Sequence, residues 1–395
     1  MLKFTTAGES HGKGLIGIIE GLPADLDITE HEVNAELKRR QKGYGRGGRM
    51  LIETDTAEFL SGVRNGKTLG SPVSFYIENK DYENWQQIMD SGPNAIIEER
   101  KVSRPRPGHA DLAGAIKYNH PDMRNVLERA SARETAVRVA AGSFFKKLLE
   151  TFSIYIYSEV IAIGSLKKIP FRPERGNLSE FYGKMEKSQL GCADISQEEE
   201  LIKLIDEARI QGESLGGVFE LGAIGVLPGL GSYISYDRRL DARLAGLLMS
   251  IPAIKAVEIG EGIDNAASPG SRVHDEIYFN ATRGIYRTTN RAGGIEGGIS
   301  NGETIRAKAY MKPIPTLYKP LLSVNTASWS EEKATIERSD ICAVPAAAVV
   351  GEAMLAFGIA EALLDNLGGD NMERIKLNYE NYREYVQKVW RWEKI

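Results

Sequence analysis

The longest apolar stretch of this 395-residue chain runs from Ala343 to Leu364, and it strongly limits the folds that the chain can adopt. Its length would suffice to cross a membrane, but it carries Glu352 and Glu361, and charged side chains are costly inside a bilayer. The stretch is also rich in alanine and glycine. We therefore predict a long buried helix at this position and no membrane span.

The same order of elements occurs twice along the chain. Strand-like segments in residues 1–80 precede a helical segment at 127–150, and strand-like segments in 216–311 precede a helix at 345–364. Strands and helices do not alternate, and no GxGxxG motif follows a strand and opens a helix, which argues against a doubly wound nucleotide-binding fold. We predict one α+β domain over residues 1–395, built from two similar halves, with an exposed insertion at about 166–213.

Composition excludes several classes of protein. Hydrophobic residues make up 42% of the chain, charged residues 26%, and the formal net charge is −4, whereas a dedicated nucleic-acid binder is usually basic. The two cysteines, Cys192 and Cys342, form neither a disulfide framework nor a metal-ligand pattern. No signal-peptide pattern opens the sequence. These features predict a cytoplasmic protein without a metal site.

The strongest local signal is a basic, glycine-rich segment at residues 38–49. Six lysines and arginines occur there without an acid, interleaved with four glycines. The cations are Lys38, Arg39, Arg40, Lys42, Arg46 and Arg49. Guanidinium and backbone N–H groups on such a loop can surround a multiply charged anion. The alternative interpretation is a solvated charged loop or a contact to RNA.

Three further segments combine arginines with polar residues. In residues 100–111 two arginines each precede a proline, which favours extended backbone. Residues 128–136 precede a helix, whose N-terminus can bind anions, and residues 337–347 precede the long apolar stretch. The residues are Arg104 and Arg106 beside His109, Arg129 and Arg133 around Ser131, and Arg338 beside Asp340. Rigid surface loops and ordinary helix capping are the alternative interpretations.

Two of the five histidines, His11 and His109, lie in glycine-containing loops beside Ser10 and the arginine segments. A single loop histidine is more often structural, but histidine is the side chain that best moves protons near neutral pH. Together with the arginines, these residues predict an enzyme whose ligand carries several negative charges, such as a phosphate and carboxylates. They do not identify the reaction.

Several long motifs of the chain resemble those of the chorismate synthase family. They are GESHGKGLIGIIEGLP at 8–23, ERASARETAVRVAAGSF at 128–144, RSDICAVPAAAVVGEAM at 338–354, and the shorter RQKGYGRGGRM, SRPRPGHADL, GGIEGGISNGE and KPIPTL. The resemblance spans nearly the whole chain, with the motifs in order. It implies a β-α-β sandwich with helices layered between antiparallel sheets, assembled as a homotetramer.

The resemblance also implies a lyase reaction. Family members convert 5-enolpyruvylshikimate 3-phosphate to chorismate and phosphate by an anti-1,4-elimination, the last common step of the shikimate pathway to the aromatic amino acids. The reaction requires reduced FMN without net redox change. Because the chain has no reductase domain, the resemblance implies a separate flavin reductase, with NADPH as a possible indirect reductant. It implies no nucleic-acid partner and no membrane.

The roles of individual residues follow from the same resemblance. As catalytic groups it implies His11 for the departing phosphate, with His109 and Asp340 for protonation at the flavin. As substrate ligands it implies Ser10, Arg40, Arg46, Arg49, Ser131, Arg133 and Arg338, with Arg104 and Arg106 as weaker candidates. As flavin contacts it implies Arg129, Ala130, Ser131, Pro252, Ala253, Gly297, Lys312, Pro313, Ile314, Pro315, Thr316 and Arg338. Arg40 and Arg46 could instead contact NADP.

Two other classes of function stay open from the sequence. An RNA- or polyanion-binding module would use residues 38–49 and show salt-dependent affinity for oligonucleotides. A conventional flavin oxidoreductase would consume reduced flavin in proportion to its product. An assay of phosphate, chorismate and flavin under anaerobic conditions separates these hypotheses.

Overall fold

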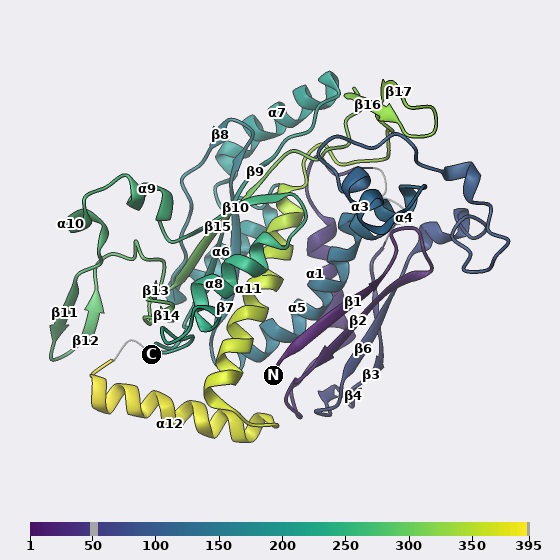
Figure 1. The fold of residues 1–395 in the computed structure, drawn as a ribbon. Coiled ribbons are helices and arrows are strands. Elements are labelled where there is room, and N and C mark those ends of the chain that lie inside the picture. Colours follow the sequence, from purple (N-terminus) through teal and green to yellow (C-terminus); the bar gives the residue numbers. More distant parts are fainter. Residues whose placement is uncertain (48–53, 393–395) are drawn as a thin grey trace.

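A computed structural model of the chain describes residues 1–47 and 54–392 and shows a layer of helices between two antiparallel sheets (Figure 1). One sheet comes from the first half of the chain and the other from the second half. The predicted α+β sandwich is therefore confirmed.

The first sheet has the strand order β1-β2-β6-β3. Its strands are β1 Lys3–Gly8, β2 Gly14–Glu20, β3 Ala57–Ser61 and β6 Val73–Glu78. Alternate residues of β2 and β6 are buried, as expected for strands with one face on a core. Between β3 and β6 lies a tight turn of the kind that an Asn-Gly pair favours, in which Asn65 and Gly66 both have positive φ and join β4 Val63–Arg64 to β5 Lys67–Thr68.

The second sheet has the order β10-β15-β9-β7-β8. Its strands are β7 Tyr155–Ile163, β8 Leu166–Lys167, β9 Gly217–Ile224, β10 Ile254–Ile259 and β15 Ile305–Met311. Short two-stranded ribbons lie outside the two sheets. They are β11 Ile277–Asn280 with β12 Gly284–Arg287, β13 Ile295–Glu296 with β14 Ile299–Ser300, and β16 Leu322–Asn325 with β17 Ser330–Lys333.

Three helices, α1, α5 and α11, fill the space between the sheets (Figure 1). Their bounds are α1 Glu30–Gln41, α5 Thr135–Glu150 and α11 Val344–Leu367. Helix α1 begins with the capping box that Thr29 and Glu32 predict. Helices α5 and α11 approach so closely that a Cβ on Gly142 would lie 2.3 Å from that of Ala353. Only small residues permit this crossing.

Helix α11 is the predicted buried helix. It is long and apolar enough to cross a membrane by composition, but 89% of its most apolar window is buried inside the protein. Its one acid near the middle, Glu352, is buried and hydrogen-bonded to Arg39, Lys146 and Ser158. The charge that argued against a membrane span is thus satisfied by partners within the core.

The remaining helices lie around this sandwich. They are α3 Asp111–Tyr118, α4 Arg124–Ala130, α6 Leu178–Lys187, α7 Glu198–Gln211, α8 Leu240–Met249, α9 Gly262–Ala266, α10 Gly270–Val273 and α12 Met372–Trp390. Single 3-10 turns occur at η1 Lys80–Asn84, η2 Ile97–Arg100 and η3 Ala132–Glu134, among others.

Two regions differ from the sequence-based expectation. The helical segment predicted at 127–150 is not one helix, because the chain is extended at Ser131, between α4 and α5. The segment 166–213 is also less exposed than predicted. Its Leu201 and Ile205 lie in the main core, and Phe181 packs on Tyr157 of the sheet. The many charged residues of this segment concealed its apolar face.

Candidate active site

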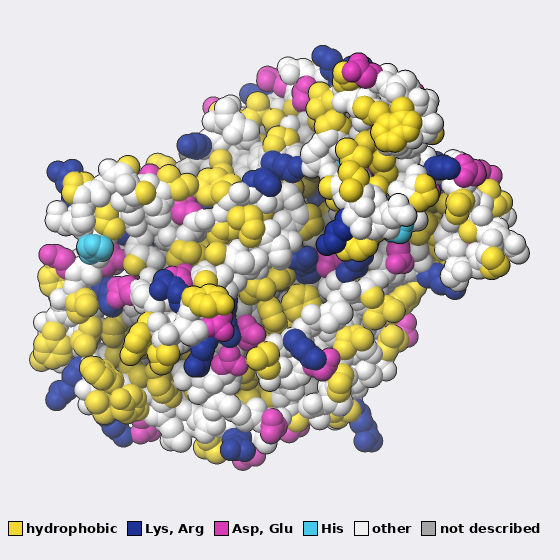
Figure 2. All heavy atoms as spheres, in the orientation of Figure 1, with side chains coloured by type: hydrophobic (Ala, Val, Ile, Leu, Met, Phe, Trp, Pro, Cys, Tyr) yellow, Lys and Arg dark blue, Asp and Glu magenta, His cyan; other side chains and the backbone are white. Residues whose placement is uncertain are grey.

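A cavity of about 1210 Å³ lies where the two halves meet, lined by residues from all four arginine-containing segments. Lys and Arg side chains gather in a hollow of the surface in Figure 2. Among the described residues that line the cavity, eight are Lys or Arg and three are acidic: Arg40, Arg46, Arg100, Arg106, Arg133, Lys255, Lys312, Arg338, Asp81, Glu337 and Asp340. The cavity can therefore hold a ligand with several negative charges.

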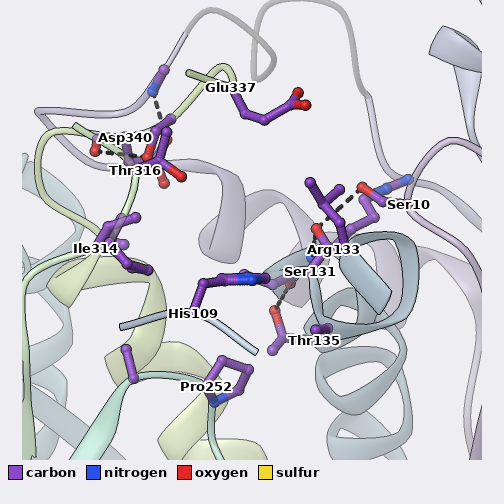
Figure 3. A pocket seen from close by; sticks show the side chains of 18 of the residues that line it. Ser10, His109, Ser131, Arg133, Thr135, Pro252, Ile314, Thr316, Glu337 and Asp340 are labelled. Carbon is purple, nitrogen blue, oxygen red and sulfur yellow. Dashed lines mark hydrogen bonds between the residues drawn. The ribbon is translucent and has the colours of Figure 1, made fainter. Parts of the chain in front are cut away.

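Most of the predicted site residues meet in this cavity. Figure 3 shows Asp340 and Thr316 on one side, Ser10 and Arg133 on the other, and His109 between them. The predicted residues that line it are Ser10, His11, Arg40, Arg46, Arg106, His109, Ala130, Ser131, Arg133, Pro252, Ala253, Lys312, Ile314, Pro315, Thr316, Arg338 and Asp340.

A few predicted residues do not line the cavity of the single chain. Arg129 turns to β1, where its guanidinium donates to the carbonyls of Thr6 and Gly8. Gly297 lies in the turn between β13 and β14, and Pro313 and Arg104 also lie outside the lining. Arg104 instead pairs with Glu332. Arg49 falls outside the described residues.

The deepest cations of the site share one buried carboxylate. Asp55 accepts hydrogen bonds from Arg40 at 3.2 Å and from Arg133 at 2.5 Å. Arg40 also donates to the Thr135 hydroxyl, and Arg133 to the amide oxygen of Asn79. Burial and the neighbouring arginines lower the pKa of Arg40 to about 10, so it stays charged at neutral pH. The two guanidiniums together carry one charge more than Asp55 neutralises.

A second pair of arginines is held by carboxylates on the other side of the cavity. Asp340 lies 3.1 Å from Arg46 and accepts from the backbone N–H of Gly47 at 2.6 Å. Arg338 donates to buried Asp81 at 2.5 Å. The loop that carries Arg46 is anchored from outside by Tyr44, whose hydroxyl donates to Asp206 of α7. Segment 166–213, in which the sequence shows no chemistry, thus contacts the loop beside the cavity.

Both predicted histidines are bound to buried carboxylates. His11 Nδ1 lies 2.8 Å from Glu128, and His109 Nδ1 lies 2.6 Å from Asp111. Burial opposes the charged form of Asp111, but hydrogen bonds from His109 and Arg106 outweigh it and hold its pKa well below the usual range. The pKa of Glu128 is lowered in the same way, with His11 outweighing burial.

Arg106 connects the pair of His109 and Asp111 to another part of the cavity. Arg106 contacts Asp111 through Nε and Nη2, at 2.8 and 3.0 Å, and donates through Nη1 to the Thr316 hydroxyl at 2.9 Å. Lys312 donates to the carbonyl of Gly108 in the same loop. Arg106 is therefore a central part of the site, although its sequence context made it only a weaker candidate.

An apolar wall completes the cavity. It is formed by Leu127, Ile251, Pro252, Met311, Ile314, Ala343, Ala346, Ala347 and Val350. Ala253, beside this wall, has a positive φ of 69°. A cavity of this volume, lined by both apolar side chains and cations, suits a flat ring system beside a polyanion.

Sequence reasoning missed several residues of the site. The carboxylates Asp55, Asp111 and Glu128, the aromatic Trp85 and the cation Arg100 are all within it or directly behind it. Asp111 and Glu128 fall inside motifs that were recognised, so the motif could have drawn attention to them. Arg100 belongs to the arginine-containing segment 100–111, so the sequence did offer a signal for it. Asp55 and Trp85 carry no local signal, because only the fold brings them to the cavity.

The fold and the cavity together are typical of an enzyme: a helix-filled sandwich whose cationic cavity contains two histidines. Comparisons with known proteins agree with this. The family model described as chorismate synthase matches residues 2–364. The chain is 62% identical to a chorismate synthase of Syntrophomonas wolfei over the full length of both proteins. It is 54% identical to that of Desulforamulus reducens, covering 98% of this chain and 100% of the relative.

A solved structure supports the same assignment. A crystal structure of chorismate synthase is 46% identical to the chain and superimposes with a TM-score of 0.79, covering 98% of each chain. The chain belongs to the chorismate synthase family and is a carbon–oxygen lyase.

Proposed function

We propose that the protein eliminates phosphate from 5-enolpyruvylshikimate 3-phosphate to give chorismate, with reduced FMN bound but not consumed. The observation that carries this proposal is the single cavity in which eight Lys and Arg side chains face three acids. The proposed substrate bears one phosphate and two carboxylates, which matches this excess of cations. Membership of the family supports the same reaction.

The chain's own side chains bind and orient the anion. Arg40 and Arg133 are pre-organised by Asp55, and Arg46 by Asp340, so little side-chain freedom is lost when the ligand binds. Ser10 and Ser131, joined by a 3.1 Å hydrogen bond, add hydroxyl groups on the same side. We assign Arg40 and Arg46 to the substrate and not to NADP, because both lie in the cavity with Arg133 and Ser131.

Proton transfer belongs to the two histidines and Asp340. His11 would give a proton to an oxygen of the departing phosphate, since its ring lies in the cavity beside Ser10. His109 and Asp340 line other parts of the cavity and would hold protons beside the bound flavin. General acid–base groups of this kind typically contribute 10²- to 10⁴-fold to a rate.

The lining residues fit a flavin. Pro252, Ile314 and Val350 offer an apolar surface for the ring system, and Lys312 offers a cation for its phosphate or for the anionic ring. A reduced flavin held by these residues would supply transient electron donation to the substrate. The apolar wall would also exclude water from this side of the site and strengthen the electrostatic interactions there.

Several further expectations belong to this proposal. We propose a cytoplasmic homotetramer that receives reduced flavin from a separate reductase, with NADPH acting only indirectly. These expectations follow from membership of the family. We propose no nucleic-acid or membrane partner.

The test is an anaerobic assay with purified protein, the enolpyruvyl substrate and reduced FMN. We expect equal amounts of phosphate and chorismate, while the absorbance of the flavin returns to that of the reduced form. Oxidation of one flavin per product would instead establish an oxidoreductase. Product formation without flavin would also contradict the proposal.

A further inference from the structure

The turn that carries His11 is fastened to one residue of α4. The Ser10 N–H donates to the carbonyl of Glu128 at 2.9 Å, and the His11 N–H donates to its carboxylate at 2.7 Å. The same carboxylate contacts the ring nitrogen Nδ1 at 2.8 Å. Glu128 is 3% exposed and His11 7%. One glutamate therefore determines both the path of the backbone and the rotation of the imidazole.

An indole ring lies against the same imidazole. The rings of His11 and Trp85 are stacked, with centroids 4.0 Å apart and an angle of 27° between their planes. Trp85 is the one buried residue between positions 82 and 100, a segment that is otherwise intermediate or exposed. A tryptophan that served only to anchor this segment would have packed on an apolar core, but Trp85 contacts a polar ring at the cavity wall.

Cations surround the indole and connect it back to Glu128. The guanidiniums of Arg100 and Arg124 each lie 5.1 Å from the Trp85 ring, a cation–π distance. Arg124 also donates to the carbonyl of Arg100 and to Glu337, and lies 3.5 Å from Glu128. The charged groups near His11 therefore include Glu128 and Arg124 on α4, Arg100 on η2, and Glu337 behind Arg124.

We propose that Glu128 and Trp85 are positioning residues that hold the His11 imidazole with Nδ1 on the carboxylate, so that Nε2 is the nitrogen that exchanges a proton with the bound ligand. The proposal rests on the proposed function only for the identity of that ligand. The ring is constrained in rotation by the Nδ1 hydrogen bond and in tilt by the indole. The carboxylate keeps its partner nitrogen protonated in the neutral ring.

The proton step then balances as follows. The Nε2–H bond breaks and an O–H bond forms on an oxygen of the phosphate, which takes the electron pair of the substrate C–O bond that breaks. His11 passes from the imidazolium to the neutral ring. The proton on Nδ1 stays on that nitrogen and keeps its hydrogen bond to the Glu128 carboxylate. Solvent returns the proton to Nε2 after the product leaves. Glu128 itself stays ionised throughout, in accord with its lowered pKa.

The test uses the full-length protein labelled with ¹⁵N at histidine, so that NMR reports the tautomer and proton release of each ring. The His11→Asn variant identifies the His11 signals. We expect the neutral ring to carry its proton on Nδ1 in the wild type. In Glu128→Gln, which keeps an acceptor but loses the charge, the pH at which His11 releases its proton falls by about one unit, a tenfold change.

Activity measurements test the same two residues in a way that a structural role would not mimic. We expect Glu128→Gln to lower kcat about 10- to 100-fold at neutral pH. The decline of the rate at high pH should begin at a lower pH than in the wild type, by the same interval as in the NMR experiment. Trp85→Leu should lower kcat about tenfold with KM little changed, and Trp85→Phe should restore most of it, because an aromatic face remains. Glu98→Gln, an exposed residue of the same segment, is the matched control.

Specific outcomes would overturn the proposal. They are a neutral His11 protonated on Nε2, an unchanged proton release in Glu128→Gln, or an equal effect of Trp85→Leu and Trp85→Phe. If Glu128→Gln does not fold, the tautomer of wild-type His11 and the comparison of Trp85→Leu with Trp85→Phe still test the proposal. The NMR experiment needs no substrate, so loss of the proposed reaction in the wild type would refute the proposed function while leaving this arrangement intact.

Discussion

Arg39 and Arg40 are neighbours on α1, yet they belong to two different charge clusters. Arg39 points to the helix layer, where it contacts Glu36 and Glu352 at 2.8 Å, and Lys146 joins the same two acids. Arg40 points to the cavity and shares Asp55 with Arg133. Consecutive residues of a helix are about 100° apart, so adjacent arginines reach opposite surroundings.

The two clusters differ in their charge balance. The core cluster has two acids for two cations, and each charge has a partner at ion-pair distance. In the cavity cluster two arginines share one aspartate, and further cations line the walls. A balanced buried cluster stabilises the fold only while all its members are present. An unbalanced cluster at a cavity keeps the capacity to bind an anion. An arginine-rich segment thus indicates a ligand site only where its cations outnumber the carboxylates that surround them in the folded protein.

The largest expected effect comes from breaking the balanced cluster. Glu352→Ala leaves Lys146 and Arg39 without their shared carboxylate in the core, and we expect it to lower the free energy of unfolding by about 3–5 kcal/mol. Chemical denaturation monitored by circular dichroism measures this. The control is Glu361→Ala on the same helix, whose carboxylate is more exposed and lies 3.6 Å from Arg243. Equal losses in both variants would contradict the comparison.

Next in size is the effect of removing charge from the cavity. Arg40→Met should reduce kcat/KM about 100-fold, equivalent to about 2.7 kcal/mol, because it removes a cation from the lining of the proposed substrate site. Arg39→Met, one residue away, should lower stability and leave kcat/KM of the folded protein nearly unchanged. Steady-state kinetics beside thermal unfolding checks both. The comparison fails if Arg39→Met loses as much activity as Arg40→Met.

Lowering the pH should have a smaller effect on the free energy of unfolding. Although burial opposes ionisation, Arg39 and Lys146 hold the pKa of Glu352 well below its ordinary value of 4.5. The stabilisation is therefore complete above about pH 4.5 and is lost as the pH falls toward the lower folded-state pKa. In that range Glu352→Gln should reduce the slope of unfolding free energy against pH by at most about 1.4 kcal/mol per unit, one proton's contribution. Urea titrations at several pH values measure the slope, and an unchanged slope would exclude Glu352 as the source.

The smallest expected effect concerns the link between the insertion and the cavity. Tyr44→Phe removes the hydroxyl that donates to Asp206, a loss of about 1 kcal/mol at the loop that carries Arg46. We expect KM for the enolpyruvyl substrate to rise a few-fold with kcat preserved. Asp206→Asn should give a smaller change in the same direction, since the amide oxygen still accepts. A change in kcat alone would show that the loop acts in another way.

Much of the local structure follows from residues close together in the sequence. A threonine three residues before a glutamate forms the capping box of Thr29 and Glu32, and an Asn-Gly pair forms the turn at Asn65 and Gly66. The break at Ser131 and the apolar face of segment 166–213 were not predicted. In both cases the local pattern, helical in one and charged in the other, did not show the contacts with distant elements that set the structure.

The sequence by itself determined the periodicities, caps and turns of this protein, and the motifs that mark its family, because these depend on residues a few positions apart. Only the tertiary structure decided which charges meet. Arg133 reaches a carboxylate 78 positions away and His11 one 117 positions away, while Arg129 turns to a strand outside the cavity. Partner choice over such separations depends on how sheets and helices pack, and no local pattern encodes it.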